Sequence, residues 1–181
     1  MPRYNNNTIQ DYLNRSDNAP NSDAKGDIFE DLVIYLFTHC KGVRLEGRNI
    51  LDETGARELD IAFWNNRSIS SFDFLDPIII CECKNVAKPL GSDKVRDFVI
   101  KLKTSGANNG ILVSSSGISG QARRNRNAKF ATSVIIDALI MDRIKIIVIS
   151  RAEILALATT DDLSNLISEK FSQLTLRRAV E

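Results

Sequence analysis

The chain has 181 residues, of which 43% are hydrophobic and 26% charged, values typical of a soluble globular domain rather than a disordered chain. Lys and Arg number 24 and Asp and Glu 23, so the formal net charge of +1 does not by itself indicate a nucleic-acid partner. A single histidine, His39, excludes zinc sites built on several histidines and catalysis by paired histidines.

The cysteines and the start of the chain bear on the cellular compartment. Three cysteines, two of them separated by one residue, do not form a disulfide framework, so a reducing compartment is expected. The first residues are polar and lack the apolar stretch of a signal peptide, and no apolar run approaches the ~20 residues that cross a bilayer. We therefore expect a cytoplasmic protein without a membrane partner.

The first half of the chain predicts an arm, a helix and three strands. Residues 1–22 are polar and rich in asparagine, which predicts a flexible N-terminal arm or a short docking segment. Apolar residues at three- and four-residue steps then predict a helix over 23–40, which Gly42 ends. Alternating or continuous apolar runs bounded by turn residues predict the strands, which cover 43–50, 59–64 and 78–84.

The second half predicts helices that alternate with strands. In chain order these are a helix over 92–103, a strand over 111–113, a helix from Ser119 to about 141, a strand over 144–149, and helices over 152–158 and 162–174. Three strands in a row followed by this alternation predict an α/β fold. Its core is a central mixed sheet of about four to five strands with helices on both faces.

Positive charge is concentrated in the middle of the chain. Residues 84–129 contain ten cationic side chains and two acidic ones, a local charge of +8, so the remainder carries −7. Four of these cations lie at the start of the helix predicted from Ser119, where backbone N–H groups also favour an anion: Arg123, Arg124, Arg126 and Lys129. This combination favours phosphate binding, and nucleic acid is the commonest polyphosphate. Gln121 is a further candidate, for contact with a phosphate or with the catalytic site.

Three charged residues lie inside predicted strands, where an unpaired charge is costly. Glu82 and Lys84 are two residues apart and therefore share one face of their strand. If the strand of Asp60 pairs with theirs, two carboxylates and an ammonium meet. Two carboxylates with room for water suit Mg²⁺ better than zinc, and the metal would activate a water and offset charge on a phosphate. Lys84 would orient that water or help neutralise the transition state.

Other catalytic arrangements are less well supported. Ser114, Ser115 and Ser116 have no histidine in the sequence other than His39 to activate them. The glycines between Gly106 and Gly120 do not form a phosphate-binding P-loop, because no Gly-Lys-Ser/Thr follows them.

The order and spacing of these residues resemble the PD-(D/E)xK nuclease superfamily with its restriction-endonuclease-like fold. The resemblance rests on Leu59-Asp60 followed by the run 79–84 (IICECK), although Leu59 stands where the family pattern has proline. The segment 106–119 (GANNGILVSSSGIS) is similar to the Mrr-type restriction endonuclease branch. The resemblance spans about residues 23–150. It implies a nuclease-like domain over 23–160, and the helix in 161–181 would pack on that domain or on a partner.

The resemblance also implies roles for single residues. Asp60 and Glu82 would be metal ligands, with the backbone carbonyl of Cys83 as a third, and Lys84 would be the catalytic lysine. Glu30, within the run 26–30 (GDIFE), matches the acidic residue that the first helix of such nucleases contributes. The metal would be Mg²⁺, with Mn²⁺ able to substitute.

We therefore expect a Mg²⁺-dependent endonuclease that hydrolyses phosphodiester bonds in DNA, of a restriction or defence type. A homodimer and a partner or regulatory subunit of a defence system are further expectations. The alternative is a catalytically inactive nucleic-acid-binding or dimerisation module on the same fold, and a purely structural subunit is a third reading.

Overall fold

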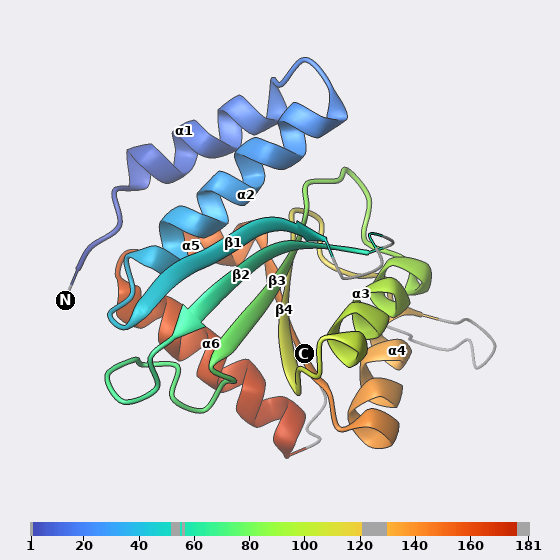
Figure 1. Cartoon of the computed structure of the whole chain (residues 1–181). Helices are drawn as coiled ribbons and strands as arrows, with labels where there is room; N and C mark the ends of the chain where they lie inside the picture. Colours follow the sequence, from blue (N-terminus) through green and yellow to red (C-terminus); the bar gives the residue numbers. More distant parts are fainter. Residues whose placement is uncertain (1, 52–54, 56, 121–129, 177–181) are drawn as a thin grey trace.

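A five-stranded sheet forms the centre of the molecule (Figure 1). The computed structural model describes residues 2–51, 55, 57–120 and 130–176. The strands are β1 (Val43–Leu51), β2 (Glu58–Asn65), β3 (Ile78–Lys84), β4 (Asn109–Ser114) and β5 (Lys145–Ser150), and they lie side by side in chain order. β1, β2 and β3 pair antiparallel, whereas β4 and β5 join in parallel. The mixed α/β sheet predicted from the sequence is thus confirmed.

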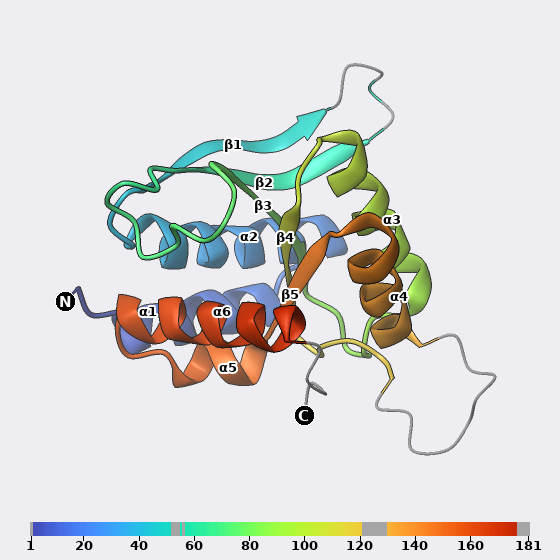
Figure 2. The ribbon, with the colours of Figure 1, turned by 90° about the horizontal axis from the view of Figure 1, so that it is seen from below.

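Helices cover both faces of this sheet (Figures 1 and 2). α3 (Ser92–Thr104) and α4 (Ala131–Asp137) lie on one side, and α4 continues into a short π-helical turn, η1 (Ala138–Asp142). α2 (Ser22–Thr38), α5 (Arg151–Ala156) and α6 (Thr160–Thr175) lie on the other side, with α1 (Asn6–Asp17) packed outside α2. None of the described helices has the length and apolar character needed to span a bilayer.

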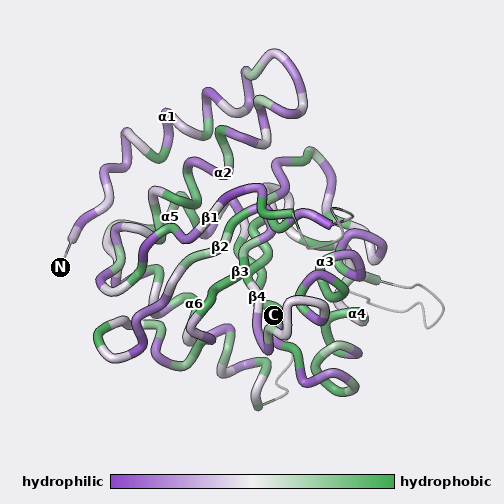
Figure 3. Tube along the Cα trace, viewed as in Figure 1, coloured by the Kyte–Doolittle hydropathy of each residue, from purple (hydrophilic) through white to green (hydrophobic). Residues whose placement is uncertain are grey.

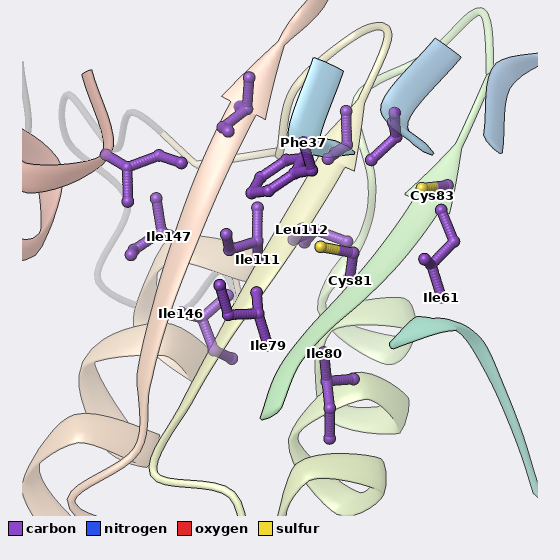
Figure 4. Packing of buried hydrophobic residues seen from close by; sticks show 14 of the residues in the cluster. Phe37, Ile61, Ile79, Ile80, Cys81, Cys83, Ile111, Leu112, Ile146 and Ile147 are labelled. Atoms are coloured by element: carbon purple, nitrogen blue, oxygen red, sulfur yellow. The ribbon is translucent and has the colours of Figure 1, made fainter. Parts of the chain in front are cut away.

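The two faces of β3 have different surroundings. Ile80 pairs with Gly110 of β4, and a side chain at Gly110 would meet Leu102 and Phe98 of α3 at 2.7 and 2.8 Å. Ile80 therefore lies on the α3 face, and Glu82 and Lys84 share that face because strand side chains alternate. Figure 3 shows the apolar character of β3 and β4, and Figure 4 shows side chains of β3, β4 and β5 packed with Phe37 of α2.

The N-terminal segment differs from expectation. The part predicted to be a flexible arm or a short docking segment contains α1, a helix capped by the side chain of Asn5, so it is not a flexible arm. Ile9, Leu13 and Ser16 are buried, and their spacing of four and three residues places them on one helical face against α2. The segment is polar overall, so its composition did not predict a helix. Only three of its residues, Ile9, Leu13 and Ser16, are buried, and they hold α1 in place because α2 covers them.

A second difference concerns the helix predicted from Ser119 to about 141. Ser119 and Gly120 are not helical, because the Ser119 N–H donates to the carbonyl of Leu90 at 2.8 Å and Ile118 forms a β-bridge with Leu90. The described helix begins at Ala131. The residues predicted to bind nucleic acid, Gln121, Arg123, Arg124, Arg126 and Lys129, lie outside the described residues.

Candidate active site

Strand pairing brings Asp60 and Glu82 together. β2 and β3 pair antiparallel with Ile61 opposite Cys81, so Asp60 and Glu82 are the next residues along and face each other. Both are buried, with exposed fractions of 8% and 5%. Since burying a carboxylate without a partner costs several kcal/mol, the pair requires compensation by cations.

Lys84 supplies one of these cations. Its Nζ lies 2.9 Å from Asp60 Oδ2 and 2.9 Å from Glu82 Oε1, so one ammonium bridges both carboxylates. Burial alone lowers the pKa of Lys84, but the charges of Glu82 and Asp60 outweigh it and raise that pKa above the ordinary lysine value. Lys84 is therefore an ammonium at neutral pH and acts as a donor and a positive charge.

A second lysine, Lys101, contacts the same pair of carboxylates from α3, the helix that covers this face of the sheet. Its Nζ lies 2.6 Å from Glu82 Oε2 and 3.6 Å from Asp60 Oδ1. In the sequence, Lys101 is only one of the ten cations of the basic middle of the chain. A signal existed, because Lys101 lies between the buried face residues Phe98 and Leu102 and therefore borders the side of α3 that meets the sheet.

The backbone of β3 also points to the carboxylates. The Cys83 N–H donates to Asp60 Oδ2 at 2.8 Å, so this group faces the β2 edge of β3. The carbonyl of one strand residue points to the same edge as its N–H, which puts the Cys83 carbonyl on the Asp60 side. The thiol of Cys83 lies on the opposite, apolar face, where burial raises its pKa well above the ordinary thiol value.

Glu30 is held apart from this cluster. Its Oε2 accepts a hydrogen bond from Arg48 Nε of β1 at 2.8 Å, and the same guanidinium reaches Asp31 and Asp27 of α2. Burial raises the pKa of Glu30, the Arg48 hydrogen bond opposes that rise, and the nearby charge of Asp60 adds to it. Among the described contacts, Glu30 has no hydrogen bond or ion pair with Asp60, Glu82 or Lys84.

The donor set fits a hard divalent cation. Asp60 and Glu82 offer four carboxylate oxygens, and the short contacts of both to one ammonium show that these oxygens face a common point. Within the described part of the chain no group of three or more His, Cys, Asp or Glu side chains is placed to hold a metal ion, so the side-chain donors at this point are the two carboxylates. Mg²⁺ is commonly bound by one or two carboxylates, its remaining positions being filled by water and phosphate oxygen.

The sheet order, the flanking helices and the carboxylate pair with its lysine define a nuclease of the restriction-endonuclease-like class. Mrr_cat, a restriction endonuclease family, matches residues 22–157, which is most of the chain. The chain therefore belongs to this restriction endonuclease family, and the resemblance drawn from the sequence is confirmed. No curated protein matches the chain. α1 precedes the matched region, and α6 follows it.

Proposed function

We propose that this protein is a Mg²⁺-dependent endonuclease that hydrolyses phosphodiester bonds in DNA, and that it acts in restriction or defence. The observation that carries the proposal is the pair of buried carboxylates, Asp60 and Glu82, bridged by Lys84 in a chain of a restriction endonuclease family. Mn²⁺ offers the same preference for oxygen ligands and is expected to replace Mg²⁺.

Asp60 and Glu82 would hold the metal, together with the Cys83 carbonyl at the same strand edge. When bound, the metal lowers the pKa of a coordinated water and offsets negative charge on the phosphate. The carboxylates orient that site because both are fixed by neighbouring strands of one sheet. Glu30 enters the proposal as a positioning residue, since its carboxylate engages Arg48 and acts on Asp60 through its charge.

Lys84 is the residue we assign to the reacting phosphate. Its ammonium carries a full charge and three N–H donors, of which two face Asp60 and Glu82, so the third can donate to the attacking water or to a non-bridging phosphate oxygen. In the reaction, the water oxygen forms a bond to phosphorus and the bond from phosphorus to the leaving oxygen breaks. The water loses a proton and the leaving oxygen gains one, so the hydrolysis needs no redox partner.

DNA as substrate rests on family membership and on the charge of the chain. Residues 84–129 carry a formal charge of +8 and the rest of the chain −7. This segment is therefore basic, which suits contact with a phosphate backbone. We propose that Arg123, Arg124, Arg126, Lys129 and Gln121 contact this backbone.

The test is the nicking of supercoiled plasmid DNA in Mg²⁺, in Mn²⁺ and in EDTA. We expect metal-dependent nicking by the parent and a loss of about 100-fold or more in Lys84→Met, because a donor to the transition state is removed. Asp60→Asn should lose cleavage as well, with circular dichroism verifying that each variant is folded.

The matched control is Lys103→Met, which removes an exposed ammonium of α3 that pairs with Asp142. Its cleavage rate should equal that of the parent. Equal cleavage by folded Asp60→Asn and the parent would refute the proposed roles. DNA binding that depends on salt, without cleavage by the parent in either metal, would favour the inactive binding module instead.

A further inference from the structure

The side chain of Lys101 is held against the carboxylate pair by the packing of α3. Phe98 and Leu102 are fully buried beneath α3, and the missing side chain at Gly110 lets this helix lie close to β4. The Lys101 side chain is 15% exposed, whereas that of Lys103, two residues later, is 51% exposed and contacts Asp142. Lys101 is thus directed into the molecule and Lys103 away from it.

Together the two lysines and one backbone N–H engage every carboxylate oxygen of the pair. Asp60 Oδ2 accepts from Lys84 and from the Cys83 N–H, and Glu82 Oε1 contacts Lys84. Lys101 takes the two remaining oxygens, Glu82 Oε2 at 2.6 Å and Asp60 Oδ1 at 3.6 Å. The two negative and two positive charges sum to zero, so any further cation must compete with an ammonium for these oxygens.

Lys101 is the ammonium that can leave. Its ammonium is attached to α3 through four flexible methylenes. Among the four lysine–carboxylate contacts, that of Lys101 with Asp60 is the longest. Lys84 contacts both carboxylates at 2.9 Å and is the lysine assigned above to the reacting phosphate, so Lys101 is the ammonium left to be displaced.

We propose that Lys101 is the built-in counter-ion of the metal site: it neutralises Asp60 and Glu82 in the metal-free protein and is displaced when a divalent cation binds. This inference rests on the proposed metal-dependent function. It assigns to Lys101 a role separate from the chemistry on phosphate, namely setting how tightly the metal is held.

The direction of the effect follows from the charges. In Lys101→Met the site changes from neutral to a net charge of −1, so a divalent cation is attracted more strongly and no longer displaces an ammonium. We expect the Kd for Mg²⁺ and Mn²⁺ to fall by about tenfold or more. The metal-free variant should unfold at a lower temperature than the parent, because two buried carboxylates then share the single ammonium of Lys84, and metal should raise its unfolding temperature by more.

The experiment measures metal binding by isothermal titration calorimetry on EDTA-treated full-length protein, without DNA. Lys103→Met is the matched control, with the same substitution on the same helix, and should bind metal as the parent does. Lys101→Arg restores the cation and should return the affinity toward that of the parent. Lys101→Gln replaces the methionine variant if the latter does not fold.

The outcomes separate this inference from the proposed function. Tighter binding by Lys101→Met alone, or binding by that variant when the parent shows none, supports the inference. Equal or weaker binding by the folded variant overturns it. Absence of metal binding in both proteins overturns the inference and the metal-dependent function together. Metal binding with the expected order of affinities but without DNA cleavage overturns the nuclease and leaves the counter-ion role standing.

Discussion

Each buried carboxylate in the described part of the protein is matched by a cation. Glu30 has Arg48, while Asp60 and Glu82 share Lys84 and Lys101. The matching has a reason at the residue scale, because an unpaired charge in a protein interior costs several kcal/mol. A substitution of Asp60 or Glu82 removes one partner from both ammonium groups and can therefore destabilise the fold. The stability of such a variant must be measured together with its activity.

A carboxylate outside the site allows a pH-dependent prediction. Glu153 accepts hydrogen bonds from Lys170 Nζ at 2.6 Å and from the backbone and hydroxyl of Ser150. Burial alone raises the pKa of Glu153, but these hydrogen bonds outweigh it and lower the pKa below the ordinary value of 4.5. The folded state therefore binds fewer protons than the unfolded state, and Glu153 stabilises the fold above pH 4.5.

We expect Glu153→Gln to lower the free energy of unfolding by about 1 kcal/mol at pH 7, because the amide can still cap the helix but the ion pair with Lys170 and the charge on the cap are lost. The difference from the parent should shrink as the pH falls from 4.5 through the lowered pKa of the folded state. Urea denaturation at a series of pH values measures it, with exposed Glu169→Gln of α6 as control. A deficit that stays constant down to pH 3 would contradict the prediction.

At the scale of elements, α1 illustrates how tertiary contacts decide secondary structure. Ser16 is fully buried, donates to the Lys25 carbonyl of α2 at 2.7 Å and accepts from Asn85 Nδ2 at 2.6 Å. Asn85 directly follows Lys84, so α1 also fixes the chain where β3 leaves the site. The helix is short and polar overall, and it depends on these contacts because isolated helices of about this length are marginal in water.

A substitution on α1 tests this dependence. Leu13 is buried against α2, so Leu13→Ala should lower the free energy of unfolding by about 3 kcal/mol, the usual result of truncating a buried leucine. Gln10→Ala, at an exposed position of the same helix, should change it little. Urea denaturation of both variants measures the difference. Equal stability of Leu13→Ala and the parent would mean that α1 is not part of the folded core.

At the scale of the whole molecule, separated charge is the main feature that composition hides. The net charge of +1 combines +8 in residues 84–129 with −7 in the rest of the chain. A basic segment of this kind favours a polyanionic partner even though the total charge stays near zero. The site itself is neutral, so DNA affinity must come mainly from cations outside it.

We expect the triple variant Arg123→Ala, Arg124→Ala and Arg126→Ala to weaken DNA binding for all sequences alike. If each arginine contacts a phosphate, the slope of log Kd against log salt concentration should decrease by about 3. Fluorescence anisotropy with a short duplex at several salt concentrations measures this slope. Metal affinity, determined in the absence of DNA, should not change. An unchanged salt slope would place the DNA contacts elsewhere.

Much of the architecture could be predicted because its signals are local. The three- and four-residue spacing of α2 and the alternation around Leu59, Ile61 and Phe63 reflect burial of one face. The continuous apolar start of β3 reflects burial of both faces. Their order in the chain then favoured a mixed sheet, which the strand pairing confirms. The same alternation placed Glu82 and Lys84 on one face.

The sequence by itself therefore determined the fold class, the family and the shared face of Glu82 and Lys84, since periodicity and motif order are properties of neighbouring residues. Only the tertiary structure decided that α1 is a helix, that Glu30 turns to Arg48, and that Lys101 of α3 reaches the pair formed by Asp60 and Glu82. These contacts depend on which helix covers each face of the sheet and on how closely that helix packs against the strands. Glu30 and Arg48 are 18 positions apart and Glu82 and Lys101 are 19 apart, and no local pattern encodes the distance between such residues.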